Sequence, residues 1–182
     1  YGLSSNRNVV WNNELFRKHE EIWNYTILIE NESFPFKIEI LKKYEEKINW
    51  KRLGWNESYL WTEEFIEKKK KKLDWAALSQ NLSMPWSEEF IEKYKDKWNW
   101  YNLSSNKSLP WSQELIEKYI DKWVLSSCTF YKNVCFPLKF IHKYSDIIRS
   151  SQNIWNTLKP YINEEMVIEL LEEIKNKSNG RN

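Results

Sequence analysis

A period of 25 residues runs through this chain and limits the folds that are open to it. Residues 76–100 read AALSQNLSMPWSEEFIEKYKDKWNW and residues 101–125 read YNLSSNKSLPWSQELIEKYIDKWVL, so most positions match at a shift of 25. The same frame defines four more units, at 1–25, 26–50, 51–75 and 126–150. A degenerate capping unit at 151–176, with Met166, Val167, Leu170 and Ile174 on apolar positions, precedes a polar tail at 177–182 that we expect to fray. A period this short is typical of proteins in which stacked units share one core.

The second half of each unit has the apolar spacing of an amphipathic helix. In the fifth unit the pattern predicts a helix over Ser112–Trp123, with Ser112 as its N-cap and with Leu115, Ile116, Tyr119 and Trp123 on its buried side. A glutamate precedes a lysine by four residues on these helices, a spacing that stabilises a helix by about 0.2–0.5 kcal/mol per pair. The pairs are Glu14/Lys18, Glu39/Lys43, Glu64/Lys68, Glu89/Lys93 and Glu114/Lys118.

The first half of each unit predicts a shorter helix that starts after a capping side chain. The expected caps are Asn24, Asn49, Asp74 and Asn99. An asparagine then recurs at the sixth position, as Asn6, Asn31, Asn56, Asn81 and Asn106. We expect these asparagines to end helices and to satisfy loop backbone groups, because Asn tolerates a left-handed backbone. The alternative is a row of amides that binds a ligand, one per unit.

Tryptophan is the residue whose placement the period explains best. Ten of the 12 tryptophans fall on three positions of the unit, and only Trp55 and Trp155 lie elsewhere. Large rings at fixed positions are typical of packing between helices, where each buries roughly 150–250 Å². Only three glycines are present, which argues against an all-β fold with many tight turns.

The fold prediction is therefore all-α: a single solenoid domain over residues 1–182, built of six two-helix units and the C-terminal capping unit. The pattern W-x-W-x-x-L-S-x-N-x-x-[LI]-x-W, followed by E-x-[IF]-E-K-[YN]-x-D-K, resembles uncharacterised tryptophan-rich short-repeat proteins of large DNA viruses and some bacteria. Residues from Trp98 to Trp123 carry this resemblance best, whereas the first, second and sixth units lose several of its residues. The resemblance implies a helical repeat architecture, it is compatible with a viral protein, and it implies no activity.

Charge does not mark the chain as a nucleic-acid binder on average, because 28 basic residues nearly balance 26 acidic ones. Lys68–Lys72 is the strongest local feature: five consecutive lysines, which are Lys68, Lys69, Lys70, Lys71 and Lys72. They could form an anion patch, or they could be a solvated helix face with the Lys69 stem across the edge of the core. Aromatic rings beside lysines keep single-stranded RNA or DNA open as an alternative partner.

Catalytic and metal-binding motifs are not visible in the sequence. The P-loop, Gly-x-Ser-x-Gly, His-Glu-x-x-His and dinucleotide patterns do not occur, so we expect no enzyme and no cofactor. Cys128 and Cys135 are expected to be buried thiols, and together with His19 and His142 they lack zinc spacing. N-x-S/T motifs at Asn24 and at four of the sixth-position asparagines are copied with the repeat, and we do not expect them to be used.

Function is expected to reside on positions that vary between units, because packing positions are not free to vary. These are the first, second, fifth and seventh positions, and the chosen binding residues are Tyr1, Arg52, Trp55, Tyr101, Asn102 and Phe130. The leading hypothesis is a scaffold that binds a protein or peptide partner; nucleic-acid binding and a self-assembling spacer are the alternatives. Without a visible signal peptide or a run of 18 apolar residues, we expect no membrane contact and a cytoplasmic location, in the host cell or virion for a viral protein.

Overall fold

The computed structural model describes residues 2–35, 38–124, 138–144 and 162–179. Every regular element in these ranges is a helix, which confirms the predicted all-α class. Contacts between Cα atoms divide the chain into two compact units, Tyr1–Leu109 and Pro110–Asn182. Among the described helices, none has both the length and the apolar character needed to cross a membrane.

One kind of helix begins near the middle of each 25-residue unit. Its members are α1 (Asn13–Lys18), α3 (Ile38–Lys43), α5 (Glu63–Lys69), α7 (Glu88–Lys93), α9 (Gln113–Lys118) and α10 (Leu138–Lys143). The predicted N-cap is confirmed, since the Ser112 hydroxyl accepts from the backbone N–H of Leu115 at 3.0 Å. The predicted length is wrong: α9 ends at Lys118, and a turn connects it to Trp123. We call this kind of helix the middle helix.

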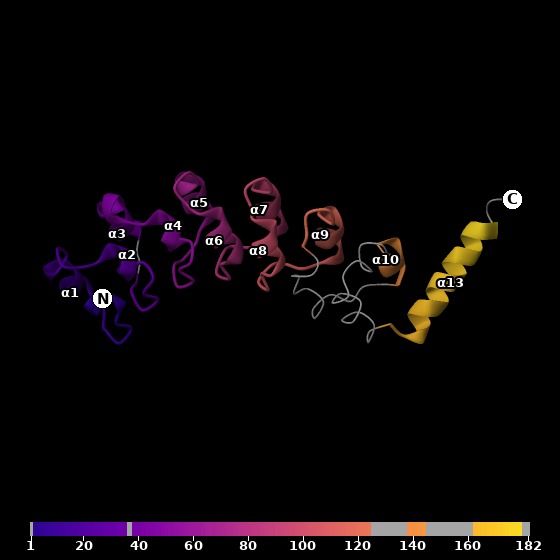
Figure 1. The fold of residues 1–182 in the computed structure, drawn as a ribbon, viewed down its shortest axis with the longest axis horizontal. Coiled ribbons are helices and arrows are strands. Elements are labelled where there is room, and N and C mark those ends of the chain that lie inside the picture. Colours follow the sequence, from indigo (N-terminus) through magenta and orange to yellow (C-terminus); the bar gives the residue numbers. More distant parts are fainter. Residues whose placement is uncertain (1, 36–37, 125–137, 145–161, 180–182) are drawn as a thin grey trace. The chain divides into compact units, whose positions relative to one another are not determined.

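The other kind of helix lies at the start of each of the first five units and has three to six residues. It comprises η1 (Leu3–Ser5), α2 (Tyr25–Leu28), α4 (Trp50–Leu53), α6 (Trp75–Gln80) and α8 (Trp100–Ser104), and a short 3-10 turn, η2 (Glu45–Lys47), precedes α4. Within residues 2–109 the two kinds of helix alternate along the chain (Figure 1). All four predicted caps are confirmed, because the side chains of Asn24, Asn49, Asp74 and Asn99 accept from backbone N–H groups of the first turn.

The core repeats with the same period. A leucine at the third position is fully buried in four successive units, as Leu28, Leu53, Leu78 and Leu103. An isoleucine of the middle helix is fully buried as well, in Ile66, Ile91 and Ile116. At these two positions, residues 25 apart in the sequence therefore share the same burial within the described residues.

The last helix, α13 (Glu164–Asn179), departs from the prediction. It continues through Lys175 into the segment that the sequence analysis expected to fray. Val167 and Ile174, which were assigned to apolar packing positions, are 40% and 45% exposed. The helix contacts α10 within the second compact unit.

Candidate functional site

The repeated tryptophans have a structural task that goes beyond packing. Each of the ten is buried or half-buried, and at least eight of them donate an indole N–H to a backbone carbonyl. Trp23 and Trp98 donate to the carbonyls of Phe16 and Ile91, at 2.9 and 3.0 Å. These carbonyls lie in the last turn of α1 and α7, where a helix leaves its C=O groups without a partner inside the helix. The rings therefore fix the turn that follows each middle helix.

The sixth-position asparagines join consecutive units to one another. Asn81 is 2% exposed, and its amide nitrogen donates to the carbonyls of Gly54 and Asn56 in the preceding unit, at 2.8 and 3.1 Å. Its amide oxygen accepts from the backbone N–H of Ser83, two residues further along. Asn31 and Asn106 make the same three contacts with their own neighbours. Both ends of these amides are used inside the protein, so they do not form a row of ligand-binding groups.

The backbone reason expected for these asparagines is wrong. No described residue other than glycine has a positive φ, and Asn81 ends α6 in an extended conformation with φ −66° and ψ 124°. Asparagine is needed because one short side chain both donates to the preceding unit and accepts within its own turn. The same contacts occupy the amide nitrogens of Asn31, Asn56, Asn81 and Asn106, which would carry the sugar in a glycosylated protein.

A serine at the fourth position links its short helix to the start of the next one. Ser79 is fully buried, and its hydroxyl oxygen accepts from the backbone N–H of Asn99 at 3.0 Å, at the start of the next short helix. Gly54 occupies this position in the third unit. A Cβ added to Gly54 would lie 2.8 Å from the Cβ of Ala77, so the backbone approach at this boundary requires glycine.

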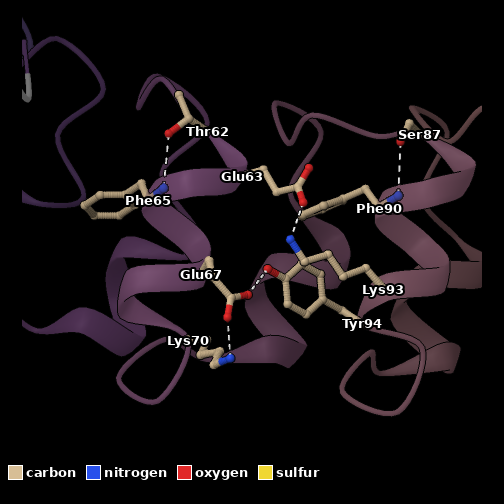
Figure 2. A network of polar contacts seen from close by, with 9 residues as sticks. All are labelled: Thr62, Glu63, Phe65, Glu67, Lys70, Ser87, Phe90, Lys93 and Tyr94. Atoms are coloured by element: carbon tan, nitrogen blue, oxygen red, sulfur yellow. Dashed lines mark hydrogen bonds and ion pairs between the residues drawn. The ribbon is translucent and has the colours of Figure 1, made fainter.

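Charged side chains also join neighbouring units. Between α5 and α7, Lys93 contacts Glu63, and the Tyr94 hydroxyl donates to Glu67, which also contacts Lys70 (Figure 2). The sequence analysis paired Lys93 with Glu89 inside one helix, and the recorded ion pair instead crosses to the preceding unit. Lys43 likewise contacts Glu20, at 2.9 Å, and Lys143 contacts Glu117, at 3.5 Å.

These contacts set the ionisation of the groups involved. Hydrogen bonds from Lys69 and Lys72 lower the pKa of Glu45 to about 2. Hydrogen bonds from Lys70 and Tyr94 lower the pKa of Glu67. Burial, followed by the nearby Glu67 carboxylate, raises the pKa of Tyr94 to about 12. Glu45 therefore stays ionised well below the pH range in which a glutamate usually titrates.

The five consecutive lysines do not present five free charges. Lys69 and Lys72 both contact Glu45, at 2.8 and 2.6 Å, and Lys70 contacts Glu67. The Lys69 ammonium also lies 4.8 Å from the centre of the Trp50 ring, a cation–π distance, and its side chain is only 16% exposed. Lys68 and Lys71 are exposed, and no ion pair is recorded for them within the described residues.

The residues chosen for partner binding lie in different settings. Trp55 is 53% exposed, and Tyr101 is 62% exposed. Arg52 is exposed and pairs with Glu30 of the preceding unit. Asn102 is half-buried and donates to the carbonyl of Ala76, at 3.0 Å. Tyr1 and Phe130 lie outside the described residues, so their placement stays a prediction.

The second position of the unit therefore takes part in joining units, which the sequence analysis did not expect. Arg52 and Asn102 both reach the preceding unit, and Ala77, at the same position, is fully buried. The fifth position is exposed in every described unit, at Ser5, Glu30, Trp55, Gln80 and Ser105. Of the variable positions, the fifth leaves its side chains available to solvent most consistently, and Trp55 is its largest member.

The remaining candidates add no further group to this surface. His142 is exposed, as expected from its side of the helix, whereas Cys128 and Cys135 lie outside the described residues. Among the residues the structure describes, no group of three or more His, Cys, Asp or Glu side chains is placed to hold a metal ion. Comparison with protein-family models, with curated proteins and with solved structures gave no match to this chain.

Proposed function

We propose that this protein is a non-catalytic helical-repeat scaffold that binds a protein or peptide partner through the variable positions of its units. The scaffold is a solenoid of two-helix units. Support for that architecture comes from the contacts that recur at each boundary: the amides of Asn31, Asn81 and Asn106 donate to carbonyls of the unit before. A unit that relies on its neighbour for its buried polar contacts gains stability by stacking.

The observation that carries the proposed function is the division of the aromatic side chains into two sets. The tryptophans on repeated positions are packed and mostly hydrogen-bonded, as Trp98 is at 5% exposure. Trp55 and Tyr101, on variable positions, expose more than half of their area. Trp, Tyr and Arg are the residues that dominate binding energy at protein interfaces, and Arg52 lies three residues from Trp55 on the same turn.

Charge favours a protein partner over a nucleic acid. Three members of the lysine run, Lys69, Lys70 and Lys72, contact glutamates of the chain itself. Binding of nucleic acid draws its affinity from cations that neutralise phosphates, and a paired lysine contributes less to that. Glutamates lie beside many of the lysines in these units, so few lysines would remain to form a continuous basic surface for a nucleic acid.

The test is an affinity capture with the whole chain and two variants. Arg52→Ala combined with Trp55→Ala should lose a partner that the wild type retains, by roughly ten-fold or more in Kd, since truncating an interface Trp or Arg costs about 2 kcal/mol or more. Val10→Ala is the matched control, because Val10 is an 85% exposed apolar side chain on another position of the unit. Partners that all three proteins retain equally would contradict the assignment of this surface.

A salt titration and a sedimentation experiment separate the alternatives. Tight binding of a single-stranded oligonucleotide that falls steeply with salt, and that is lost on changing Lys68 and Lys71 to Gln, would favour a nucleic-acid function. Oligomers that grow with protein concentration in the absence of any partner would favour a self-assembling array. We expect neither result.

A further inference from the structure

The boundary between α3 and α5 differs from the boundary between α5 and α7, because the residues that bridge α5 and α7 are replaced. At the α5–α7 boundary, Glu63 contacts Lys93 and Glu67 accepts from Tyr94 (Figure 2). One unit earlier, the residues at these four positions are Ile38, Lys68, Lys42 and Lys69. Both acids are absent from α3, and a lysine stands in place of the tyrosine.

A cavity of about 380 Å³ lies between α3 and α5. Its lining combines the apolar side chains of Leu41 and Phe65 with the hydroxyl of Thr62 and with charged groups. The charged lining residues are Lys42, Glu45, Glu64, Lys68 and Lys69. A hollow of this volume with apolar walls and a few polar groups is typical of a site that receives one or two side chains of a ligand.

Electrostatics in the cavity favours an anion. Glu45 is already bound by Lys69 and Lys72, so its charge is compensated. Lys42 and Lys68 are exposed, and no ion pair is recorded for either of them among the described residues. The remaining acid of the lining, Glu64, balances one of these two lysines at most.

Lys68 differs from three lysines that occupy the same position in other units, because those three form ion pairs with the preceding unit. The equivalent lysines Lys43 and Lys93 each contact a glutamate of the preceding unit, Glu20 and Glu63. Lys143, in the second compact unit, contacts Glu117. The three glutamates stand at three different positions of the unit. For Lys68, Ile38 stands at the position of Glu63 and Lys42 at the position of Glu117. Glu45, the equivalent of Glu20, is already bound by Lys69 and Lys72, so none of the three carboxylates is left for Lys68 at this boundary.

We propose that this cavity, which we term the α3–α5 cavity, binds an acidic side chain of the partner together with an adjacent apolar side chain. The carboxylate would contact Lys42 and Lys68, and the apolar neighbour would pack on Leu41 and Phe65. The inference rests on the proposed function, since it names the partner chemistry for a peptide-binding scaffold. Charge complementarity of this kind gives specificity more than affinity, and the contact should weaken with salt.

Fluorescence anisotropy with short peptides tests the site. The probes are N-acetylated, C-amidated hexapeptides with a central Glu-Leu, Gln-Leu or Glu-Ser pair in a Gly/Ser background. The whole chain should bind the Glu-Leu peptide roughly ten-fold more tightly than either of the others, because only that peptide supplies both the carboxylate and the apolar group. Equal binding of the Glu-Leu and Gln-Leu peptides would overturn the proposal, and so would competition by an equimolar amount of inorganic phosphate.

Two variants and one control locate the binding. Lys42→Gln combined with Lys68→Gln should weaken binding of the Glu-Leu peptide roughly ten-fold, and Lys18→Gln, at the position equivalent to Lys68 in the first unit, should leave it unchanged. Lys42→Glu combined with Lys69→Tyr restores the pair found at Glu67 and Tyr94, so it should close the cavity and abolish binding while the circular dichroism spectrum is preserved. Undiminished binding by this second variant overturns the proposal.

The outcomes also separate this inference from the proposed function. A captured partner that depends on Arg52 and Trp55 but ignores the Lys42 and Lys68 changes would overturn the α3–α5 cavity alone. Failure of the Arg52 and Trp55 variant to lose any partner, with selective Glu-Leu binding still present, would overturn the surface assigned to those residues and retain the cavity.

Discussion

The amide nitrogen of Asn106 lies 3.2 Å from the carbonyl oxygen of Asn81, the residue that holds the same position in the preceding unit. Asn81 donates in turn to the carbonyl of Asn56, at 3.1 Å. All three side chains are buried, and each amide oxygen accepts from a backbone N–H of its own turn. The asparagines are thus fully satisfied polar groups inside the protein, which is the state that buried amides require.

Removal of one of these amides should destabilise the fold. Asn81→Ala leaves the carbonyl of Gly54 and the N–H of Ser83 without this partner, and it removes one of the two donors to the carbonyl of Asn56, so we expect a loss of about 2–4 kcal/mol in the free energy of unfolding. Asn6→Ala is the control. Asn6 is exposed, and the one contact of its side chain within the described residues is a hydrogen bond that its amide oxygen accepts from the N–H of Asn8. Urea denaturation should show a loss of at most about 1 kcal/mol for it. Equal losses for both variants would contradict the role assigned to Asn81.

The indole N–H groups can be tested apart from ring packing. Trp98→Phe keeps an aromatic ring against Phe90 but removes the donor that lies 3.0 Å from the Ile91 carbonyl. We expect it to cost about 1–3 kcal/mol in thermal or urea unfolding, from the lost hydrogen bond and the smaller ring. Trp55→Phe, on an exposed ring, should change stability by less than about 0.5 kcal/mol. A Trp98→Phe variant as stable as the wild type would argue against a structural role for the indole donor.

Gly54 should not tolerate a side chain. Gly54→Ala places a Cβ 2.8 Å from the Cβ of Ala77, and overpacking of this kind costs about 1–3 kcal/mol. Adding Ala77→Gly removes the opposing atom, so the double variant should lose less than the sum of the two single changes. A double-mutant cycle measured by urea denaturation checks the coupling, and strict additivity of the two losses would contradict direct contact between the residues.

Acid should weaken the contact of Glu45 with Lys69 and Lys72, which joins the second and third units. The pKa of Glu45 is lowered from 4.5 to about 2 by Lys69 and Lys72, so the folded protein holds a proton on this group less readily than the unfolded chain does. Its contribution to stability is therefore complete above pH 4.5 and is lost as the pH falls toward 2. Between these values, the melting temperature of the wild type should fall more steeply than that of Glu45→Gln, measured by circular dichroism. Parallel curves would show that the contact does not contribute.

The start of a helix could be predicted from the sequence wherever a capping side chain precedes it. Asn24, Asp74 and Ser112 cap the helices that their positions indicated, because a short side-chain oxygen has few other ways to satisfy the first turn. The ends were less predictable. Apolar spacing continues past Lys118 to Trp123 although the helix does not, since the Trp123 ring returns from the turn to lie 4.8 Å from the ring of Trp111. The apolar spacing correctly indicated which residues are buried together, but these residues do not all lie on one unbroken helix.

Contacts between units were harder to anticipate than contacts within them. The i,i+4 rule paired Lys93 with Glu89, and the recorded partner is Glu63 of the preceding unit. A comparison of units column by column would have helped: Lys42 stands where the next three units carry Glu67, Glu92 and Glu117. That difference is visible in the sequence, but its meaning depends on which residue of the next unit faces it, and only the structure places Lys68 and Lys69 there.

Every asparagine link runs in one sense, from an amide of a later unit to carbonyls of an earlier one. A run of units therefore presents different groups at its two ends: amide donors on the N-terminal side and carbonyl acceptors on the C-terminal side. Severing it before residue 76 would leave the buried amide nitrogen of Asn81 without its two acceptors, whereas severing it after residue 100 would remove donors from the carbonyls of Ala76, Ser79 and Asn81, which water can readily replace. Shortened versions of this protein should accordingly tolerate trimming from the C-terminal side of a unit better than trimming from its N-terminal side.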